Sequence, residues 1–409
     1  MNLLIVLVIG GSITLKPEFG IGADYSSQRY STYSLDTLPA DTSAIETEGR
    51  SFLGLALNLS SNPTELAGKN TFHVSTSSIR NHLNLDLNQR LSALFRLEAD
   101  FQTELRHYHK ALPVLADTAF RRDYWNSSGS IDLRLEPSER FNIALGDAAE
   151  YQRYFQPDSF SYNYLRNRIR TSLSVRPGLL TTVDAGYDLS NCRAQNSDSN
   201  SYLDHAIRVG IDRFLDPGWQ LRLGAGLTRR RYPSPSRSYR EINPEGSIRR
   251  DLGAAAAVAL DDCSRITWFD SPVDIYRNEF ENRLALVLEL RPTPPLSFRL
   301  GPEHQFSRSL DSPSSTDYTE FAFLGGLDVM QPGRIWLSIE DRLGSRTYPQ
   351  AESSFSSSYR FNELNISGNM TIVPGLTLDA FIAIAPEWHA DKTENLAGLT
   401  FSLELTYRP

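Results

Sequence analysis

SLSVRPGLLTTVDAGYDL, residues 172–189, alternates between apolar and polar side chains on both sides of a Pro-Gly turn. Successive side chains of a β-strand point to opposite faces, so this segment predicts a hairpin with one apolar and one polar face. The apolar face carries Leu173, Val175, Thr181, Val183, Ala185, Tyr187 and Leu189. That face must contact either a second sheet or lipid.

The same alternation recurs along the chain. Further examples are 91–105, 221–227, 284–290, 376–384 and 399–407. Several of these runs reach about 10 residues, the length that a tilted strand needs to cross a bilayer.

The connections between the alternating runs fall into two length classes. Short turns, many with Pro and Gly, are expected at 87–90, 136–140, 176–179, 215–219, 260–265, 291–296, 330–334 and 373–376. Longer polar stretches lie near 107–119, 150–162, 190–202, 229–247, 270–279, 303–318, 343–359 and 386–395. Short turns at one end and long loops at the other are typical of a transmembrane β-barrel.

Three soluble architectures fit this pattern less well. A β-sandwich has shorter strands and does not sort its loops by length. A propeller blade needs about four short strands where this chain has two long ones. A soluble barrel with this many strands has an interior too wide for side chains to fill. We therefore predict an all-β fold, a transmembrane antiparallel up-and-down β-barrel of about 16–18 strands, with the apolar face toward lipid.

Composition agrees with a strand-rich membrane protein. The 409 residues include 18 Tyr and 20 Phe but 3 Met, and the mean hydropathy of −0.35 disfavours a bundle of membrane helices. A net charge of −8 argues against nucleic acid as a partner. Cys192 and Cys263 are too few for a zinc cluster or a disulfide framework. We expect Cys192 in a long loop and Cys263 in a short turn, at opposite ends of the barrel and unable to form a disulfide.

Three regions are expected. Residues 1–23 resemble a signal peptide, with an apolar core from Leu3 to Ile9, although no basic residue precedes it; a buried first strand is the alternative. The polar segment 24–49 is rich in Ser, Thr and Tyr, and fits a plug, a periplasmic extension or a disordered leader. Residues 50–409 form the barrel.

The chain resembles a bacterial outer-membrane β-barrel of the porin-like class from residue 50 onward. The resemblance is one of architecture and identifies no individual family. It implies a location in the bacterial outer membrane, contact with its lipid and assembly by the outer-membrane assembly machinery. It also implies a final strand that ends on an aromatic residue. Tyr407 meets that expectation imperfectly, because Arg408 and Pro409 follow it.

Charged side chains on the polar face are the candidate functional residues. Arg166, Arg168 and Arg170 form a basic ladder, and Glu98, Asp100 and Glu104 an acidic one. Both ladders are expected in the middle to loop-side half of the lumen. They would either face each other across the pore and set a transverse field, or pair with neighbouring charges.

Aromatic side chains cluster near the expected strand ends, where an interfacial girdle would put them. They are Tyr162, Tyr164, Tyr202, Trp219, Trp268, Trp336, Tyr359, Phe361, Trp388 and Tyr407. The basic loop at 229–246 is expected to be solvated, with contact to lipopolysaccharide as an alternative.

The sequence gives little support for an enzyme. His107 and His109 share a strand face, but no third metal ligand is suggested, and the seven histidines are scattered. No catalytic residue, metal site or cofactor is predicted. We expect a non-enzymatic channel for passive passage of small polar or charged solutes. An occluded barrel with a structural, secretion or surface-display role is the alternative, and a membrane-embedded hydrolase is a third. Oligomeric state is not predicted.

Overall fold

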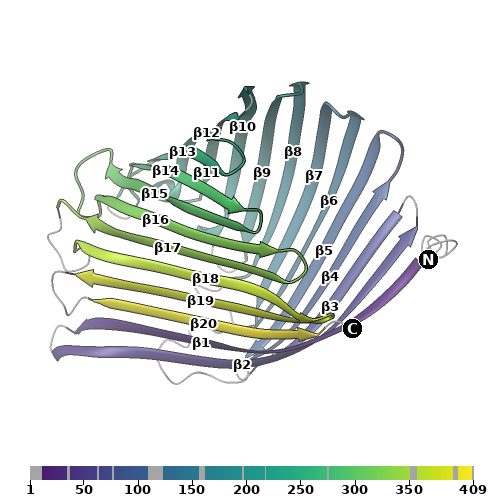
Figure 1. Cartoon of the computed structure of the whole chain (residues 1–409). Helices are drawn as coiled ribbons and strands as arrows, with labels where there is room; N and C mark the ends of the chain where they lie inside the picture. The colour runs from purple at the N-terminus through teal and green to yellow at the C-terminus, as the bar shows by residue number, and fades with distance from the viewer. Residues whose placement is uncertain are drawn as a thin grey trace.

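The computed structural model is a closed barrel of 20 antiparallel strands (Figure 1). It describes residues 12–34, 37–61, 64–75, 78–108, 123–155, 162–195, 198–216, 218–273, 276–350, 357–389 and 395–407. Each strand pairs with its neighbours in the chain, so the predicted all-β, up-and-down antiparallel barrel is confirmed.

The first ten strands are β1 Ser12–Ser34, β2 Thr37–Ser61, β3 Thr64–Ser75, β4 Ser78–Arg90, β5 Phe95–Tyr108, β6 Tyr124–Ser138, β7 Phe141–Tyr154, β8 Tyr164–Gly178, β9 Thr181–Ala194 and β10 Tyr202–Asp216. The second ten are β11 Trp219–Arg231, β12 Tyr239–Asp251, β13 Ala256–Phe269, β14 Glu279–Thr293, β15 Leu296–Ser309, β16 Tyr318–Gln331, β17 Ile335–Thr347, β18 Tyr359–Val373, β19 Leu376–His389 and β20 Leu396–Tyr407. The hairpin predicted at 172–189 is β8–β9.

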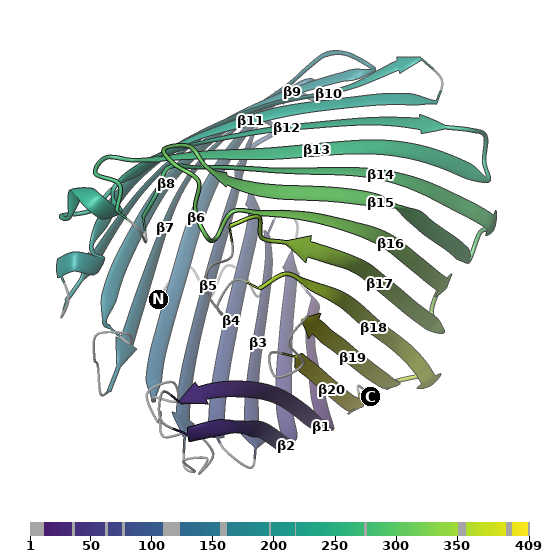
Figure 2. The same cartoon turned by 90° about the vertical axis from the view of Figure 1, so that its left-hand side faces the viewer.

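Strand β1 closes the barrel by pairing with both β2 and β20. Its Phe19 lies opposite Tyr407, and Tyr407 also lies opposite Leu376, the first residue after a short turn. Figure 2 shows β1, β2 and β20 side by side where the first and last strands meet. Every described strand therefore has a partner on both sides, as a barrel in lipid requires.

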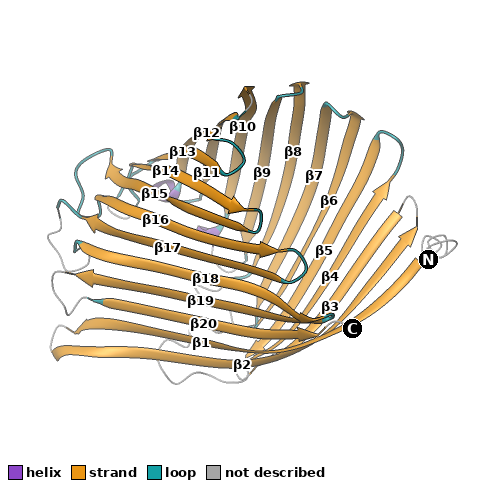
Figure 3. Cartoon of the chain, in the orientation of Figure 1, coloured by secondary structure: helices purple, strands orange, loops and turns teal. Residues whose placement is uncertain are grey.

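Strands dominate the described chain, and the loops carry two 3-10 helices of three residues, Asp198–Asn200 and Pro235–Arg237 (Figure 3). Within the described ranges, no helix is both long and apolar enough to span a bilayer.

The barrel has 20 strands, where about 16–18 were predicted from the sequence. The two strands that were not predicted are β1 and β3. A single strand was expected at 71–87, where the structure has the end of β3 and most of β4. Residues 24–49 were expected to form a separate segment, but β1 and β2 include almost all of them. Sequence pattern missed these strands because the connection at 76–77 is very short and 24–49 lacks an apolar alternation. The signal peptide stays a prediction: residues 1–11 lie outside the described chain, and 12–23 begin β1.

Two polar stretches expected as connections lie in strands. The turn expected at 260–265 is the middle of β13, and the connection before β13 is at 252–255. Most of the basic loop expected at 229–246 belongs to β11 and β12, leaving 232–238 between them. Beside this loop, Arg229 donates two hydrogen bonds of 2.6 Å to Asp270, which hold the pKa of that carboxyl below its usual value.

Both cysteines are free, as expected, although neither lies in a loop or turn. Cys192 is buried near the loop end of β9, and Cys263 is in the middle of β13. The placement of Cys263 was wrong because Asp261 and Asp262 gave its surroundings the composition of a turn.

Ion pairs identify the inner face of the barrel. Arg170 on β8 reaches over β7 to Asp132 on β6. Arg249 on β12 reaches over β13 to Glu289 at 2.9 Å. Side chains of next-nearest strands converge on the concave side of a curved sheet and diverge on the convex side. The charged face is therefore the lumen.

The opposite face carries the exposed apolar side chains, among them Leu145, Leu223, Phe323 and Leu343, which are 49–55 % exposed. Burying so much apolar surface requires a hydrocarbon solvent around the cylinder. The fold and this outer surface are those of a transmembrane β-barrel.

Candidate functional site

The predicted basic ladder lies on the luminal face of β8, and each arginine has a carboxylate partner. Arg166 pairs with Glu150, Arg168 with Asp188 at 2.9 Å, and Arg170 with Asp132. The alternative in which luminal charges pair with their neighbours therefore describes these arginines.

The acidic ladder on β5 has three different environments. Glu98 pairs with Arg134 at 2.6 Å, and Glu104 accepts a 2.5 Å hydrogen bond from the Tyr124 hydroxyl. Asp100 accepts a hydrogen bond of 3.3 Å from Gln102. Asp100 lies near the middle of the strand, as expected, whereas Glu98 lies in the turn-side half, because the turn is at 91–94 and not at 87–90.

The two ladders do not face each other across the pore. β5 and β8 are three strands apart in a barrel of 20, so they belong to the same part of the wall. The transverse field expected from opposed ladders is therefore wrong, since sequence alternation gives the face of a residue but not its angular position.

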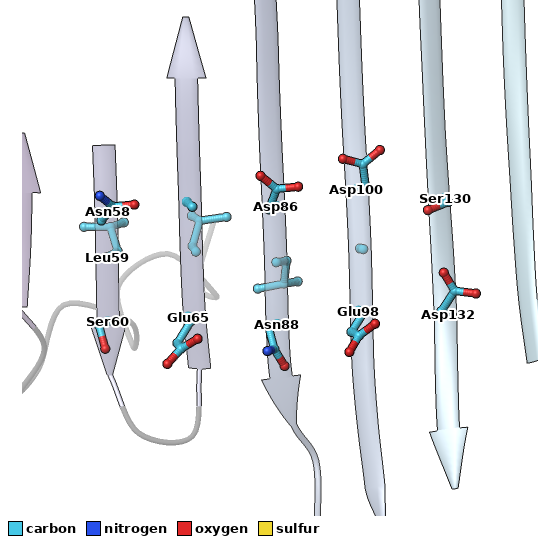
Figure 4. Close-up of a pocket in the computed structure, with 14 residues that line it drawn as sticks. Asn58, Leu59, Ser60, Glu65, Asp86, Asn88, Glu98, Asp100, Ser130 and Asp132 are labelled. Atoms are coloured by element: carbon cyan, nitrogen blue, oxygen red, sulfur yellow. The ribbon is translucent and has the colours of Figure 1, made fainter. Parts of the chain in front are cut away.

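A hollow of about 460 Å³ lies on the luminal wall between β2 and β6 (Figure 4). Its polar lining consists of Asn58, Ser60, Glu65, Asp86, Asn88, Glu98, Asp100, Ser130 and Asp132. We call it the acidic hollow. Asp86 and Asp100 are direct cross-strand partners on β4 and β5, and Figure 4 shows their carboxylates at similar height.

The acidic hollow carries uncompensated negative charge. Arg134 and Arg170 neutralise Glu98 and Asp132, but among the described residues no basic side chain lies within 4.0 Å of Asp86 or Asp100. Like charges on adjacent strands repel, so their proximity concentrates negative potential in the lumen. The described residues contain no group of three or more Asp, Glu, His or Cys arranged to hold a metal ion.

Gly146 on β7 makes room for the Arg170–Asp132 pair. A Cβ at this position would lie 2.0 Å from Asp132 Oδ1 and 2.8 Å from Arg170 Nε. We expect Gly146→Ala to separate the two side chains and to cost about 1 kcal/mol of unfolding free energy, measured by denaturant titration in lipid. Gly186→Ala is the control, because its Cβ would meet nothing closer than 3.6 Å. Equal stabilities for the two variants would contradict this role.

A second charged cluster, with more deeply buried carboxylates, lies on β14–β17. Arg342 contacts Glu303 at 2.7 Å and also contacts Glu320. Glu303 has a second partner in Arg283, and Glu320 has a second partner in Arg346. The Glu303 and Glu320 side chains are 1 % exposed. This cluster fixes the wall, because removing its shared arginine leaves two buried carboxylates poorly compensated.

Most of the tyrosines expected in a lipid-facing girdle point into the lumen. Tyr164 shares the face of Arg166, and Tyr202 and Tyr359 contact luminal arginines at 4.5 and 5.7 Å from ring centroid to guanidinium. The sequence alone could have shown this, because Tyr164 lies two residues from Arg166 and side chains two apart in a strand point to the same face. By strand parity, Trp268 and Trp388 face outward near the loop ends of β13 and β19.

The outer face also carries a repeated polar pair that sequence analysis did not identify. In each case the Asp is the seventh residue of its strand and accepts a hydrogen bond from an Asn on the next strand. The pairs are Asp147–Asn167 at 3.0 Å, Asp262–Asn282 at 2.6 Å and Asp341–Asn362 at 2.7 Å. Pairing satisfies groups that would be costly to leave without a partner in lipid.

Of the expected histidine pair, His109 lies outside the described residues. His107 contacts Asp123 at 2.6 Å. A serine, histidine and glutamate do meet at the loop end: Ser357 Oγ is 2.5 Å from His389 Nδ1, and Glu387 is 3.5 Å from His389 Nε2. At 3.5 Å the second contact is longer than a good hydrogen bond, and a hydrolase stays the third of the predicted alternatives.

No protein-family model and no curated protein match the chain. Solved structures do match it. The FrpB iron transporter from Neisseria meningitidis has a TM-score of 0.64 and 9% identity, with 97% of this chain and 81% of that chain covered. The copper transporter OprC has a TM-score of 0.62 and 10% identity, with 97% and 83% covered. The alcaligin outer-membrane receptor FauA from Bordetella pertussis has a TM-score of 0.58 and 10% identity, with 95% and 76% covered. At identities this low, the structural matches establish that the fold is shared and nothing beyond the fold.

Proposed function

We propose that this outer-membrane barrel carries small polar or charged solutes across the membrane through its lumen. The supporting observation is a charged and polar inner wall in a closed cylinder of 20 strands. Side chains fill the interior of a barrel of about 8 strands, while barrels of 16–18 strands leave an aqueous channel and 22-stranded ones a plugged lumen. Two of the similar structures also support this proposal, since they are named as an iron transporter and a copper transporter.

Passive passage is the specific form of this proposal. The alternative remains an occluded barrel with a structural, secretion or surface-display role. Planar-bilayer recording separates the two, because an open lumen gives stepwise conductance. Purified protein that inserts without conducting would contradict passive passage. Contacts with lipopolysaccharide and with the assembly machinery stay predictions, whereas the exposed apolar face accounts for contact with lipid.

The acidic hollow predicts cation preference. A carboxylate in water changes the energy of an ion at 4 Å by about 1 kcal/mol. We therefore expect Asp86→Asn with Asp100→Asn to lower the K⁺/Cl⁻ permeability ratio several-fold, measured from the reversal potential in a KCl gradient.

Asp341→Asn is the matched control for this experiment. It removes one negative charge, against two in the Asp86/Asp100 variant, but from the outer face, where Asp341 binds Asn362, and should leave the reversal potential unchanged. An unchanged ratio in the Asp86/Asp100 variant would contradict the role given to the acidic hollow.

A further inference from the structure

A second hollow lies on the luminal wall between β4 and β7, toward the loop end. Its volume is about 520 Å³, within the range of small-molecule sites. It is lined by His82, Gln102, Thr103, Glu104, Tyr124, Asn126, Ser128, Glu150, Gln152 and Tyr154. All but Thr103 share the luminal parity of their strands. We call it the tyrosine hollow.

Hydrogen bonds within the lining hold its polar groups in place. Asn126 Nδ2 donates to Gln152 Oε1 at 2.6 Å, and the Tyr124 hydroxyl donates to Glu104 at 2.5 Å. These bonds use one end of each amide and one oxygen of Glu104. Among the described residues, the side-chain oxygen of Asn126, the amino group of Gln152 and the second carboxylate oxygen of Glu104 make no further hydrogen bond, so they are available to a ligand.

Two aromatic rings form an apolar part of the same wall. The centroids of Tyr124 and Tyr154 are 6.0 Å apart with an interplanar angle of 58°. Their half-buried rings lie among donors and acceptors, so the hollow combines an apolar surface with directed hydrogen bonding.

The charge of the lining limits the class of ligand. It contains two glutamates and no lysine or arginine, which disfavours an anion. Arg166 pairs with Glu150, and this offsets one of the two negative charges. A neutral ligand with many hydroxyl groups fits these conditions, because each hydroxyl both donates and accepts and its carbon-bound hydrogens can contact a ring.

The geometry points to the tyrosine hollow as a binding site for a neutral saccharide at the loop-side entrance of the lumen. This inference rests on the proposed passage function and names a class of solute for it. The site would hold a sugar before it moves past the charged wall farther down.

Saturation-transfer NMR with maltotriose and the purified full-length barrel tests the inference. We expect transfer to the sugar-ring protons, and Asn126→Ala with Gln152→Ala should weaken binding at least ~10-fold, equivalent to about 1.4 kcal/mol. Absence of transfer, or unchanged binding by the variant, would overturn the site. Binding without conductance would leave the site standing while contradicting passive passage.

Two controls make the result specific. Asn365→Ala with Asn369→Ala removes two luminal amides from β18, outside the hollow, and should leave maltotriose binding unchanged. Putrescine tests the competing cationic ligand, and we expect it not to displace the sugar. Displacement by putrescine, or loss of binding in the β18 variant, would refute a saccharide site here.

Discussion

Arg342→Met is expected to lower the unfolding free energy of the barrel by about 3–5 kcal/mol, the range for breaking a buried ion pair from one side. Arg342 contacts both Glu303 and Glu320, whose side chains are 1 % exposed. Without this guanidinium, two carboxylates stay out of water with fewer partners. Reversible denaturant unfolding in lipid bilayers, followed by tryptophan fluorescence, measures the change.

Arg222→Met is the matched control. Arg222 also pairs with a luminal carboxylate, Asp212 at 2.9 Å, but its side chain is 65 % exposed. An exposed pair contributes about 0–1 kcal/mol, so this variant should unfold close to wild type. Similar losses for both variants would show that burial does not set the strength of the Arg342 cluster.

Gly301→Ala should have the second large effect. A Cβ on Gly301 would lie 1.7 Å from the Leu286 carbonyl oxygen and 2.8 Å from its carbonyl carbon. These are backbone atoms of the neighbouring strand β14, so relief requires the two strands to separate. Pro302 lacks an N–H, and no ladder pair is present at this point, so little can compensate. We expect a loss of about 3 kcal/mol or failure to assemble, measured by the heat-dependent shift of the barrel on gels.

Gly210→Ala tests whether any luminal glycine would show the same effect. Its Cβ would meet the Leu223 carbonyl oxygen at 3.7 Å, an ordinary contact. The variant should fold and shift on heating like wild type. A Gly301→Ala barrel that shifts like the Gly210→Ala barrel would contradict the close approach of β14 to β15 at Gly301.

The alternation of apolar and polar residues predicted the barrel because neighbouring side chains in a strand point to opposite faces of the sheet. The β8–β9 hairpin shows this directly: Leu173 and Ala185 are cross-strand partners on the outer face, and Ser172 lies opposite Gly186 on the inner face. The same logic placed Arg166 and Asp100 in the lumen. It could not place them around the circumference, since that requires every strand to be counted.

Strand counting failed where composition and structure disagree. Asp261 and Asp262 resemble a turn in the sequence, but Asp262 is tolerated within β13 because Asn282 on β14 binds it at 2.6 Å. The partner lies 20 residues away, so local composition cannot reveal it. The tyrosine hollow was missed for a related reason: Tyr124 and Tyr154 come together through the pairing of β6 with β7.

Single-cysteine labelling along β11 tests the central claim most directly. In a background without Cys192 and Cys263, each residue from 221 to 228 is replaced by cysteine and the barrel is reconstituted in lipid. We predict a period of two. Fluorophores at positions 221, 223, 225 and 227 should be quenched by brominated lipid, and positions 222, 224, 226 and 228 should react with a charged maleimide from water. Quenching at all eight positions, or at none, would contradict a polar lumen enclosed by a lipid-facing wall.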